Sequence, residues 1–327
     1  MPQPRADVNG LLIVDKPGLP RSADPAAWPK LPTSHDIVQR VRRLSGQRRI
    51  GHTGTLDPMA GGVLVLCLGI ATRLVEYYQG HDKRYLAEIT LGAETDTYDA
   101  LGAVTNQQPV PDLDSQRIEA VLRAFTGEIE QKPPIYSALK QDGESLHRKA
   151  RRGEAVEVAA RPVTIYSLEL VTWTPPARLL VRVHCSAGTY VRSLAHDLGV
   201  ALGTCAHLSY LRREAVGNFV EQNAHTLDEI EDAAKRNELT ALLRAAGDAL
   251  DLPAVVLDVA GAERIGHGQK VWLDLPTRPT GDLIQAHDDH AQLLGILRIL
   301  QRAENGVGAL CKAEKWLAPH LDQVHLS

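Results

Sequence analysis

The sequence predicts an α+β protein in two parts, and three observations support this. Apolar residues recur at strand spacing and at helix spacing over residues 1 to about 250. From about 251 to 327 the chain instead shows short β-like runs separated by Gly, Pro and Asp, which predicts a small β-rich module. The length of 327 residues is itself more typical of two domains than of one.

The first elements follow from local patterns. Residues 10–14 predict a short strand, and a proline-rich loop or insertion follows at about 18–33. Thr33 then provides an N-cap for a helix whose apolar residues recur at helical spacing up to Leu44. The six apolar residues 63–68 end at a glycine and predict a buried strand.

The same reasoning predicts the remaining elements. Further helices are expected over residues 71–78, 114–125, 193–202 and 226–248. Further strands are expected over residues 83–91, 163–173 and 178–185, with a last short or edge strand at 210–213. Polar or proline-paired loops are expected at 95–99 and 132–140. In the tail, β-like runs cover residues 254–259, 271–275 and 293–300.

Composition excludes several classes of protein. The net charge of −4 argues against a globally basic nucleic-acid-binding protein, so an anionic partner requires a local basic patch. The four cysteines lie far apart without a CxxC pair, which favours free thiols in a reducing compartment. No apolar run approaches 18 residues and no signal-peptide profile is present, so we expect a soluble, cytoplasmic protein without membrane contact. Neither HExxH nor GxxxxGK[ST] occurs, and no metal site is predicted.

The stretch GHTGTLDPMAGGVLVLCLG, residues 51–69, is the strongest candidate for chemistry. Pro58 disfavours a helical conformation at Asp57, so this acid is expected on an extended, glycine-rich loop. The buried strand that follows would anchor the loop. A carboxylate nucleophile needs such rigid support and an open face, although aspartates are also common in ordinary turns.

Two basic clusters lie on predicted helices. Five arginines occur between residues 40 and 49 with no acid among them, and a second cluster spans residues 147–152. Each is either a phosphate-binding face or a solvated surface.

Five segments together resemble the bacterial TruB family, the tRNA pseudouridine-55 synthases. They are Asp15-Lys16-Pro17, GHTGTLDPMAGGVLVLCLG, KRYLAEITLGAETDTYDALG, KPPIYSALKQDGESLHRKARRG, and CSAGTYVRSLAHDLG followed by YLRR. The resemblance implies the pseudouridine-synthase fold, with a mixed, largely antiparallel central sheet flanked by helices. It also implies a catalytic domain over residues 1–250 and a PUA-like RNA-binding β-barrel over 251–327.

The chemistry implied by the resemblance is the cofactor-free isomerisation of the uridine at position 55 in the T-loop of tRNA. Asp57 matches the family's nucleophile, which attacks either C1′ of the ribose or C6 of the base. Arg192 matches the arginine that pairs with this carboxylate. The base then detaches, rotates and rejoins the ribose through C5.

Other positions match groups that receive the extruded uridine. Tyr85 matches the aromatic residue that stacks on the target base, and Tyr190 the second tyrosine of the site. His52 matches a histidine that fills the space left by the base, and Leu211 a residue packing on the uracil edge. Lys16 is expected to support the site from the first strand.

The resemblance also implies a tRNA partner, bound through its T-arm by a monomer that needs no protein partner. The candidates for contact with the RNA backbone are Arg42, Arg43, Arg48, Arg49, Arg148, Arg151 and Arg152. The chain departs from the family in three places. Sixteen residues from Pro17 stand where a couple are usual, His147 replaces a tyrosine, and the tail has seven Lys/Arg against ten Asp/Glu.

Two other functions are compatible with these residues. One is a non-catalytic chaperone that binds and refolds tRNA through the same surface. The other is a relative that modifies another RNA or needs a guide complex.

Overall fold

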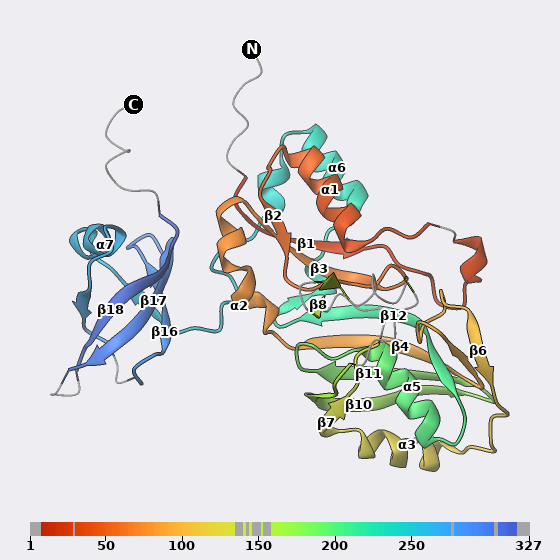
Figure 1. The fold of residues 1–327 in the computed structure, drawn as a ribbon. Coiled ribbons are helices and arrows are strands. Elements are labelled where there is room, and N and C mark those ends of the chain that lie inside the picture. The colour runs from red at the N-terminus through yellow and green to blue at the C-terminus, as the bar shows by residue number, and fades with distance from the viewer. Residues whose placement is uncertain are drawn as a thin grey trace.

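The computed structural model describes residues 8–28, 30–134, 140–141, 144–145, 152, 158–275, 278–303 and 307–318. Two sheets organise them, one of nine strands and one of five (Figure 1). In the larger sheet, among the described strand pairs, only β3 (Gly61–Leu68) and β12 (Ala206–Val216) run parallel. The prediction of an α+β protein with a mixed, largely antiparallel sheet is therefore confirmed.

The larger sheet brings the two halves of the first part together. Its order is β1 (Gly10–Lys16), β3, β12, β4 (Lys83–Leu91), β11 (Arg178–Cys185), β10 (Arg161–Thr174) and β7 (Gly127–Gln131). The short strands β2 (Ile50–His52) and β13 (Phe219–Val220) pair with β3 and β12. Two separate ladders stand outside this sheet: β5 (Ala93–Thr95) pairs with β6 (Val104–Gln107), and β8 (Lys140–Gln141) with β9 (Glu144–Ser145). These four strands and β7 were not predicted.

One strand prediction was wrong in kind. Residues 210–213 were expected to form a short or edge strand, but they belong to the eleven-residue β12 between β3 and β4. The structure buries Arg213 at 2% exposure, because backbone carbonyls of Val63 on β3 and of Gly54 on a distant loop accept its hydrogen bonds.

The strand β3 is buried on both faces, which explains its unbroken apolar sequence. Leu64 and Leu66 face one apolar core, and Val63 and Val65 face another. The first core lies between the sheet and its helices. The second reaches the C-terminal part of the chain, since it also contains Ile296.

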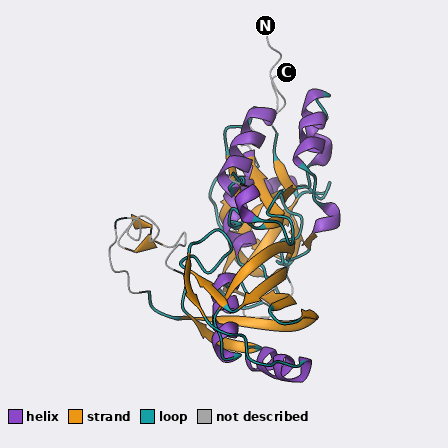
Figure 2. Ribbon diagram, turned by 90° about the vertical axis from the view of Figure 1, so that its right-hand side faces the viewer, coloured by secondary structure: helices purple, strands orange, loops and turns teal. Residues whose placement is uncertain are grey.

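The helices pack their apolar residues into the first core and flank the strands (Figure 2). Helix α1 (Ser34–Ser45) begins at Thr33, whose side chain and that of Asp36 form a reciprocal capping box. The other helices on this core are α3 (Ser115–Ala124), α5 (Val191–Ala201) and α6 (Leu227–Lys235).

Two of the helix predictions hold only in part. The expected helix over 71–78 is a 3₁₀ helix, Gly69–Leu74, followed by the short α2 (Val75–Gln79). The expected helix over 226–248 ends with α6 and a 3₁₀ turn, Leu239–Leu242. Two further 3₁₀ turns cover Pro25–Ala27 and Glu221–Asn223.

The C-terminal part is a five-stranded half-barrel. Its strands run in the order β14 (Ala254–Val256), β16 (Leu283–His287), β17 (Leu293–Arg302), β18 (Ala309–Trp316) and β15 (Val271–Leu273). The three predicted runs lie on β14, β15 and β17. The strands β16 and β18 and the helix α7 (Val259–Gly266) were not predicted.

The half-barrel is attached to the larger sheet by polar contacts as well as by the second core. Lys315 lies 3.2 Å from Glu76, and Arg73 donates a hydrogen bond to the carbonyl of Trp316. No helix in the described part of the chain is long and apolar enough to cross a membrane.

The parallel contact between β3 and β12 depends on a glycine, which generates a stability prediction. Gly62 has φ +96°, and a Cβ there would lie 2.2 Å from the carbonyl oxygen of Arg213. Gly62→Ala should therefore lower the free energy of unfolding by at least about 2 kcal/mol, measured by urea denaturation.

Gly80→Ala is the matched control for this prediction. Gly80 has φ −71°, and a Cβ added to it would have no described atom within 4 Å. Its substitution should change the free energy of unfolding by less than about 0.5 kcal/mol. Equal unfolding midpoints for the two variants would contradict the role given to Gly62.

Candidate active site

The loop that carries Asp57 is fixed from several sides. It joins β2 to β3, and Leu56 and Met59, on either side of the Asp57–Pro58 pair, are buried. The Ser34 hydroxyl accepts a hydrogen bond from the Leu56 amide at 2.8 Å and donates one to the Leu56 carbonyl at 3.0 Å. The loop is thus anchored to the first turn of α1, while Asp57 itself is only half-buried.

Lys16 supports the same loop from the end of β1. Its ammonium donates hydrogen bonds to the carbonyls of Ala60, Pro58 and Pro17 at 2.7, 3.0 and 3.1 Å. Burial lowers the pKa of Lys16 to about 8, and the negative charge of Asp57 opposes this shift. The residue is therefore cationic near neutral pH, and its position agrees with the supporting role expected of it.

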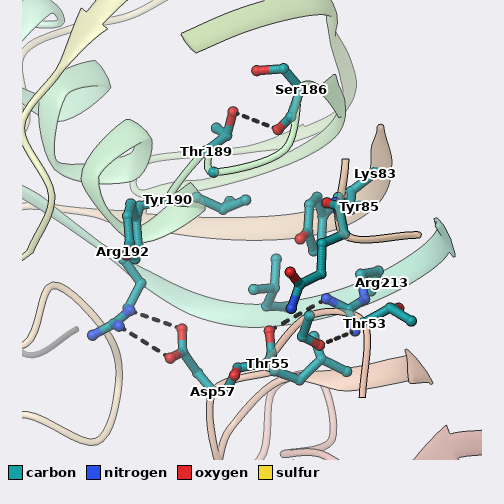
Figure 3. Close-up of a pocket in the computed structure, with 16 residues that line it drawn as sticks. Thr53, Thr55, Asp57, Lys83, Tyr85, Ser186, Thr189, Tyr190, Arg192 and Arg213 are labelled. Atoms are coloured by element: carbon teal, nitrogen blue, oxygen red, sulfur yellow. Dashed lines mark hydrogen bonds and ion pairs between the residues drawn. The ribbon is translucent and has the colours of Figure 1, made fainter. Parts of the chain in front are cut away.

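Arg192 forms an ion pair with Asp57 across the pocket (Figure 3). Its Nε lies 2.9 Å from Asp57 Oδ2, and its Nη2 donates a hydrogen bond to Oδ1 at 3.1 Å. Two parallel contacts fix the orientation of the carboxylate as well as its position. Arg192 lies in the first turn of α5, which begins two residues before its predicted start, and Tyr190 is the N-cap.

A second carboxylate faces the same guanidinium, and the sequence analysis missed it. Asp99 Oδ2 lies 3.5 Å from Arg192 Nη1, which also donates a hydrogen bond to the Thr97 carbonyl at 3.1 Å. Burial raises the pKa of Asp99, and the charge of Arg192 opposes the shift. The only signal in the sequence was the acidic, turn-rich run at 95–99, which reads equally well as a solvated loop.

Asp57 and Arg192 lie at the wall of a pocket of about 310 Å³. Tyr85, Tyr190 and Leu211 line the same pocket, so the structure brings five predicted site residues together. Tyr85 is 8% exposed and Leu211 is 5% exposed. They lie on the neighbouring strands β4 and β12, whose side chains alternate between the two faces of the sheet. The described residues that line it are Thr53, Gly54, Thr55, Leu56, Asp57, Gln79, Lys83, Tyr85, Ser186, Gly188, Thr189, Tyr190, Val191, Arg192, Leu211 and Arg213.

Tyr190 is held at the pocket by its backbone. The side-chain amide of Gln131 accepts a hydrogen bond from the Tyr190 amide at 2.7 Å and donates one to its carbonyl at 3.1 Å. The guanidinium of Arg161 lies 5.1 Å from the centre of the Tyr190 ring.

Two buried cations in the lining were also missed. Arg213 donates hydrogen bonds to the carbonyls of Val63 and Gly54 at 2.7 and 3.0 Å. Lys83 donates to the carbonyl of Gln79 at 2.8 Å and to that of His81, and burial lowers its pKa to about 8. Alternation along YLRR places Arg213 on the same face as Leu211, which was the available signal.

His52 lies next to the pocket but not in its lining. It is half-buried on β2, and its Nδ1 has no hydrogen-bond partner among the described residues. Burial lowers the pKa of His52, with Arg213 adding to the shift, so the ring is neutral near pH 7. A neutral ring with an unpaired nitrogen fits a spacer better than a proton donor.

None of the predicted RNA-binding arginines that the structure describes lines the pocket. Arg43, Arg48 and Arg49 are exposed on and after α1, and Arg42 is half-buried, donating a hydrogen bond to the Arg48 carbonyl at 3.1 Å. Arg152 is exposed. Arg148, Arg151, His147 and most of the predicted loop over 132–140 lie outside the described residues. Within the described ranges, no group of three or more His, Cys, Asp or Glu side chains could hold a metal ion.

Comparisons with known proteins identify the family. Residues 42–191 match the model of the TruB family pseudouridylate synthase N-terminal domain. Residues 192–251 match that of the tRNA pseudouridylate synthase B C-terminal domain, so the half-barrel lies beyond both matches.

Similar curated proteins cover most of the chain. tRNA pseudouridine synthase B of Caldanaerobacter subterraneus is 40% identical over 264 residues, which are 81% of this chain and 90% of the relative. The protein of the same name from Cupriavidus metallidurans is 42% identical over 309 residues, which are 92% of this chain and 93% of the relative.

Solved structures resemble the chain over nearly its whole length. A chain in an H/ACA RNP bound to a substrate RNA containing 2′-deoxyuridine has 25% identity and a TM-score of 0.71, covering 96% of this chain and 86% of that one. A chain in a Cbf5-Nop10-Gar1 complex has 26% identity and the same TM-score and coverage. On this sequence and structural similarity, the chain belongs to the TruB family of pseudouridine synthases.

Proposed function

We propose that this chain is a tRNA pseudouridine synthase that isomerises the uridine at position 55 of the T-loop, with Asp57 as nucleophile. The observation that carries the proposal is the Asp57 carboxylate, paired with Arg192 at a pocket that Tyr85 and Tyr190 also line. The curated relatives, named tRNA pseudouridine synthase B, support the same activity.

In the proposed reaction, the Asp57 carboxylate attacks either C1′ of the ribose or C6 of the uracil. The N1–C1′ bond breaks, the base rotates, and a C5–C1′ bond forms. The covalent bond between Asp57 and the substrate breaks, which restores the carboxylate, and C5 loses its proton while N1 gains one. Substrate and product are isomers, so the reaction consumes no co-substrate, and a covalent intermediate divides it into easier steps.

The pocket suits a uridine extruded from its loop. Extrusion costs a few kcal/mol, and stacking on the Tyr85 ring would return about 1–3 kcal/mol. Burial raises the pKa of Tyr85, so its hydroxyl stays protonated at neutral pH. Leu211 would pack on the uracil edge, and His52 would fill the space that the base has left.

The T-arm would be held by basic residues outside the pocket. We propose that Arg42, Arg43, Arg48, Arg49, Arg148, Arg151 and Arg152 contact its phosphates. Such contacts position a nucleic acid without reading its bases.

We also propose that residues 1–250 form the catalytic domain and 251–327 a PUA-like RNA-binding module. The five-stranded half-barrel over the second range supports this division, and its sequence holds seven Lys/Arg and ten Asp/Glu. The protein would act in the cytoplasm as a monomer, without the protein partners of its structural neighbours.

Removal of the nucleophile separates catalysis from RNA binding. Asp57→Asn should lower tritium release from tRNA labelled at C5 of uridine by at least about 10³-fold, while tRNA affinity stays within about threefold. Asp112→Asn, at an exposed residue before α3, is the matched control and should release tritium like the wild type. Tritium release by Asp57→Asn at the wild-type rate would exclude Asp57 as the nucleophile. If the wild-type protein refolds tRNA but releases no tritium, the result would favour the non-catalytic chaperone.

The ion pair generates a graded prediction. Arg192→Lys keeps the charge but loses the paired contacts, so kcat should fall about 10²-fold with little change in KM. Asp99→Asn should lower kcat about tenfold, because Asp99 contacts Arg192 and not the reacting atoms. Unfolding midpoints measured in parallel distinguish loss of the fold from loss of orientation. A smaller fall in kcat for Arg192→Lys than for Asp99→Asn would contradict the inference that the paired contacts with Asp57 matter more than the contact with Asp99.

Reaction without a guide distinguishes this enzyme from an RNP subunit. The purified protein should form pseudouridine at position 55 of an unmodified tRNA transcript with no added protein or RNA. Mapping by carbodiimide modification and primer extension gives the position. Product that appears only after addition of a cell extract would favour a guided relative.

A further inference from the structure

The residues inserted between β1 and α1 form a structured segment beside the nucleophile loop. The structure describes residues 18–28 and 30–33 of this segment, here named the strap. We propose that the strap extends the substrate-binding surface, and that Trp28 stacks on an unpaired nucleotide of the RNA next to the target uridine. This inference rests on the proposed function.

Both ends of the strap are joined to the loop that carries Asp57. At one end, the Leu19 amide donates a hydrogen bond to the Met59 carbonyl at 2.8 Å. Gly18 comes so close that a Cβ there would lie 2.4 Å from the Gly61 nitrogen. At the other end, Thr33 leads directly into the Ser34 hydroxyl that binds Leu56. The strap therefore holds a fixed position relative to the nucleophile.

The middle of the strap is ordered by its own contacts. Leu19 is 2% exposed and packs in the first core. Arg21 forms an ion pair at 2.8 Å with Glu88, which is buried on β4. The Asp24 carboxylate accepts a hydrogen bond from the Ala26 amide at 2.9 Å and so caps the 3₁₀ turn before Trp28. Trp28 is thus presented from a defined turn.

A groove of about 470 Å³ separates the strap from the active-site loops. Its described residues are Pro25, Ala26, Trp28, Lys30 and Leu31 of the strap, facing Pro58, Ala100 and Leu101. Pro58 follows the nucleophile, and Ala100 follows the Asp99 that contacts Arg192. The groove therefore adjoins the nucleophile loop, which also lines the catalytic pocket, and the loop whose Asp99 contacts Arg192. In Figure 1 the strap runs from α1 toward β6, the strand after Leu101.

The chemistry of the groove favours a nucleotide. Trp28 is 42% exposed and Leu101 43%, so an apolar surface is left open on both walls. Lys30, the one charged residue among those described in the lining, supplies a cation for a phosphate. Of the nearby carboxylates, Asp24 caps its turn and Asp36 closes the capping box of α1, where its charge also interacts with that of Lys30. An aromatic face with an adjacent cation is the usual means of binding single-stranded RNA.

Substitution of Trp28 tests the proposal in steady-state kinetics on a T-arm stem–loop. Trp28→Ala should raise KM about tenfold and leave kcat unchanged, since stacking is lost while the reacting groups stay in place. Trp28→Phe should stay within about threefold of the wild-type KM. Tyr166→Ala removes another exposed aromatic ring, on β10, and should not change KM. An unchanged KM for Trp28→Ala, or an equal rise for Tyr166→Ala, would overturn the proposal.

A second experiment identifies the nucleotide and keeps the two proposals separable. A set of stem–loops is prepared, each with a single abasic site at a different loop position other than the target. The affinity of each stem–loop is measured for the Asp57→Asn protein and for the Asp57→Asn, Trp28→Ala double variant. At one position the abasic site should lower affinity about tenfold for the protein that has Trp28, and should not lower it for the protein that lacks Trp28. Losses that are independent of Trp28 at every position would overturn the inference. Absence of pseudouridine formation by the wild type would instead overturn the proposed function.

Discussion

Arg192 faces two carboxylates that reach it from separate loops, and the geometry of the site depends on this arrangement. Asp57 takes the paired contacts and Asp99 the longer one, so a single guanidinium orients the nucleophile and compensates a buried acid. Removal of one partner from a buried pair leaves an uncompensated charge, which costs more than the pair contributes. The first turn of α5 fixes where the guanidinium lies, so the position of this helix on the sheet sets the direction in which Asp57 points.

Around this pair, the buried cations bind backbone carbonyls. Lys16 binds three carbonyls near the nucleophile loop, Arg213 binds that loop and β3, and Lys83 binds the turn after α2. The main chain of the loop is therefore fixed without the use of its side chains, and Thr53 and Thr55 remain at the pocket. Because carbonyls carry only partial charges, these contacts leave the cations charged, and cations beside a pocket attract a polyanionic substrate.

The fold could be predicted well for helices and strands that pack one apolar face in a single core, because their sequences show a regular apolar period. The strand 83–91 and the helix begun by Thr33 have this property, and both appear as expected. Prediction failed where burial depends on residues far apart in the sequence. Residues 210–213 were expected as a short or edge strand, and nothing near Arg213 in the sequence indicates that Gly54 will accept its hydrogen bonds. Asp57, Tyr85 and Leu211 were found through the motifs of the family. The contact of Asp99 with Arg192 and the role of the strap could be inferred only from the structure. In the sequence, a polar turn at a functional site has the same residue types as an ordinary solvated turn.

The two-sided burial of β3 has a consequence for the half-barrel that is independent of RNA. Ile296 of β17 and Leu317 share a core with Val63 and Val65, which lie on the strand directly after the nucleophile loop. Unfolding of the half-barrel would expose that side of β3 to water, at a cost of about 25 cal/mol for each Å² of apolar surface. The folded half-barrel therefore stabilises β3 by keeping that side of the strand buried. A change that loosens it would be transmitted through one strand to the position of Asp57, even though no described residue of the tail lines the substrate pocket.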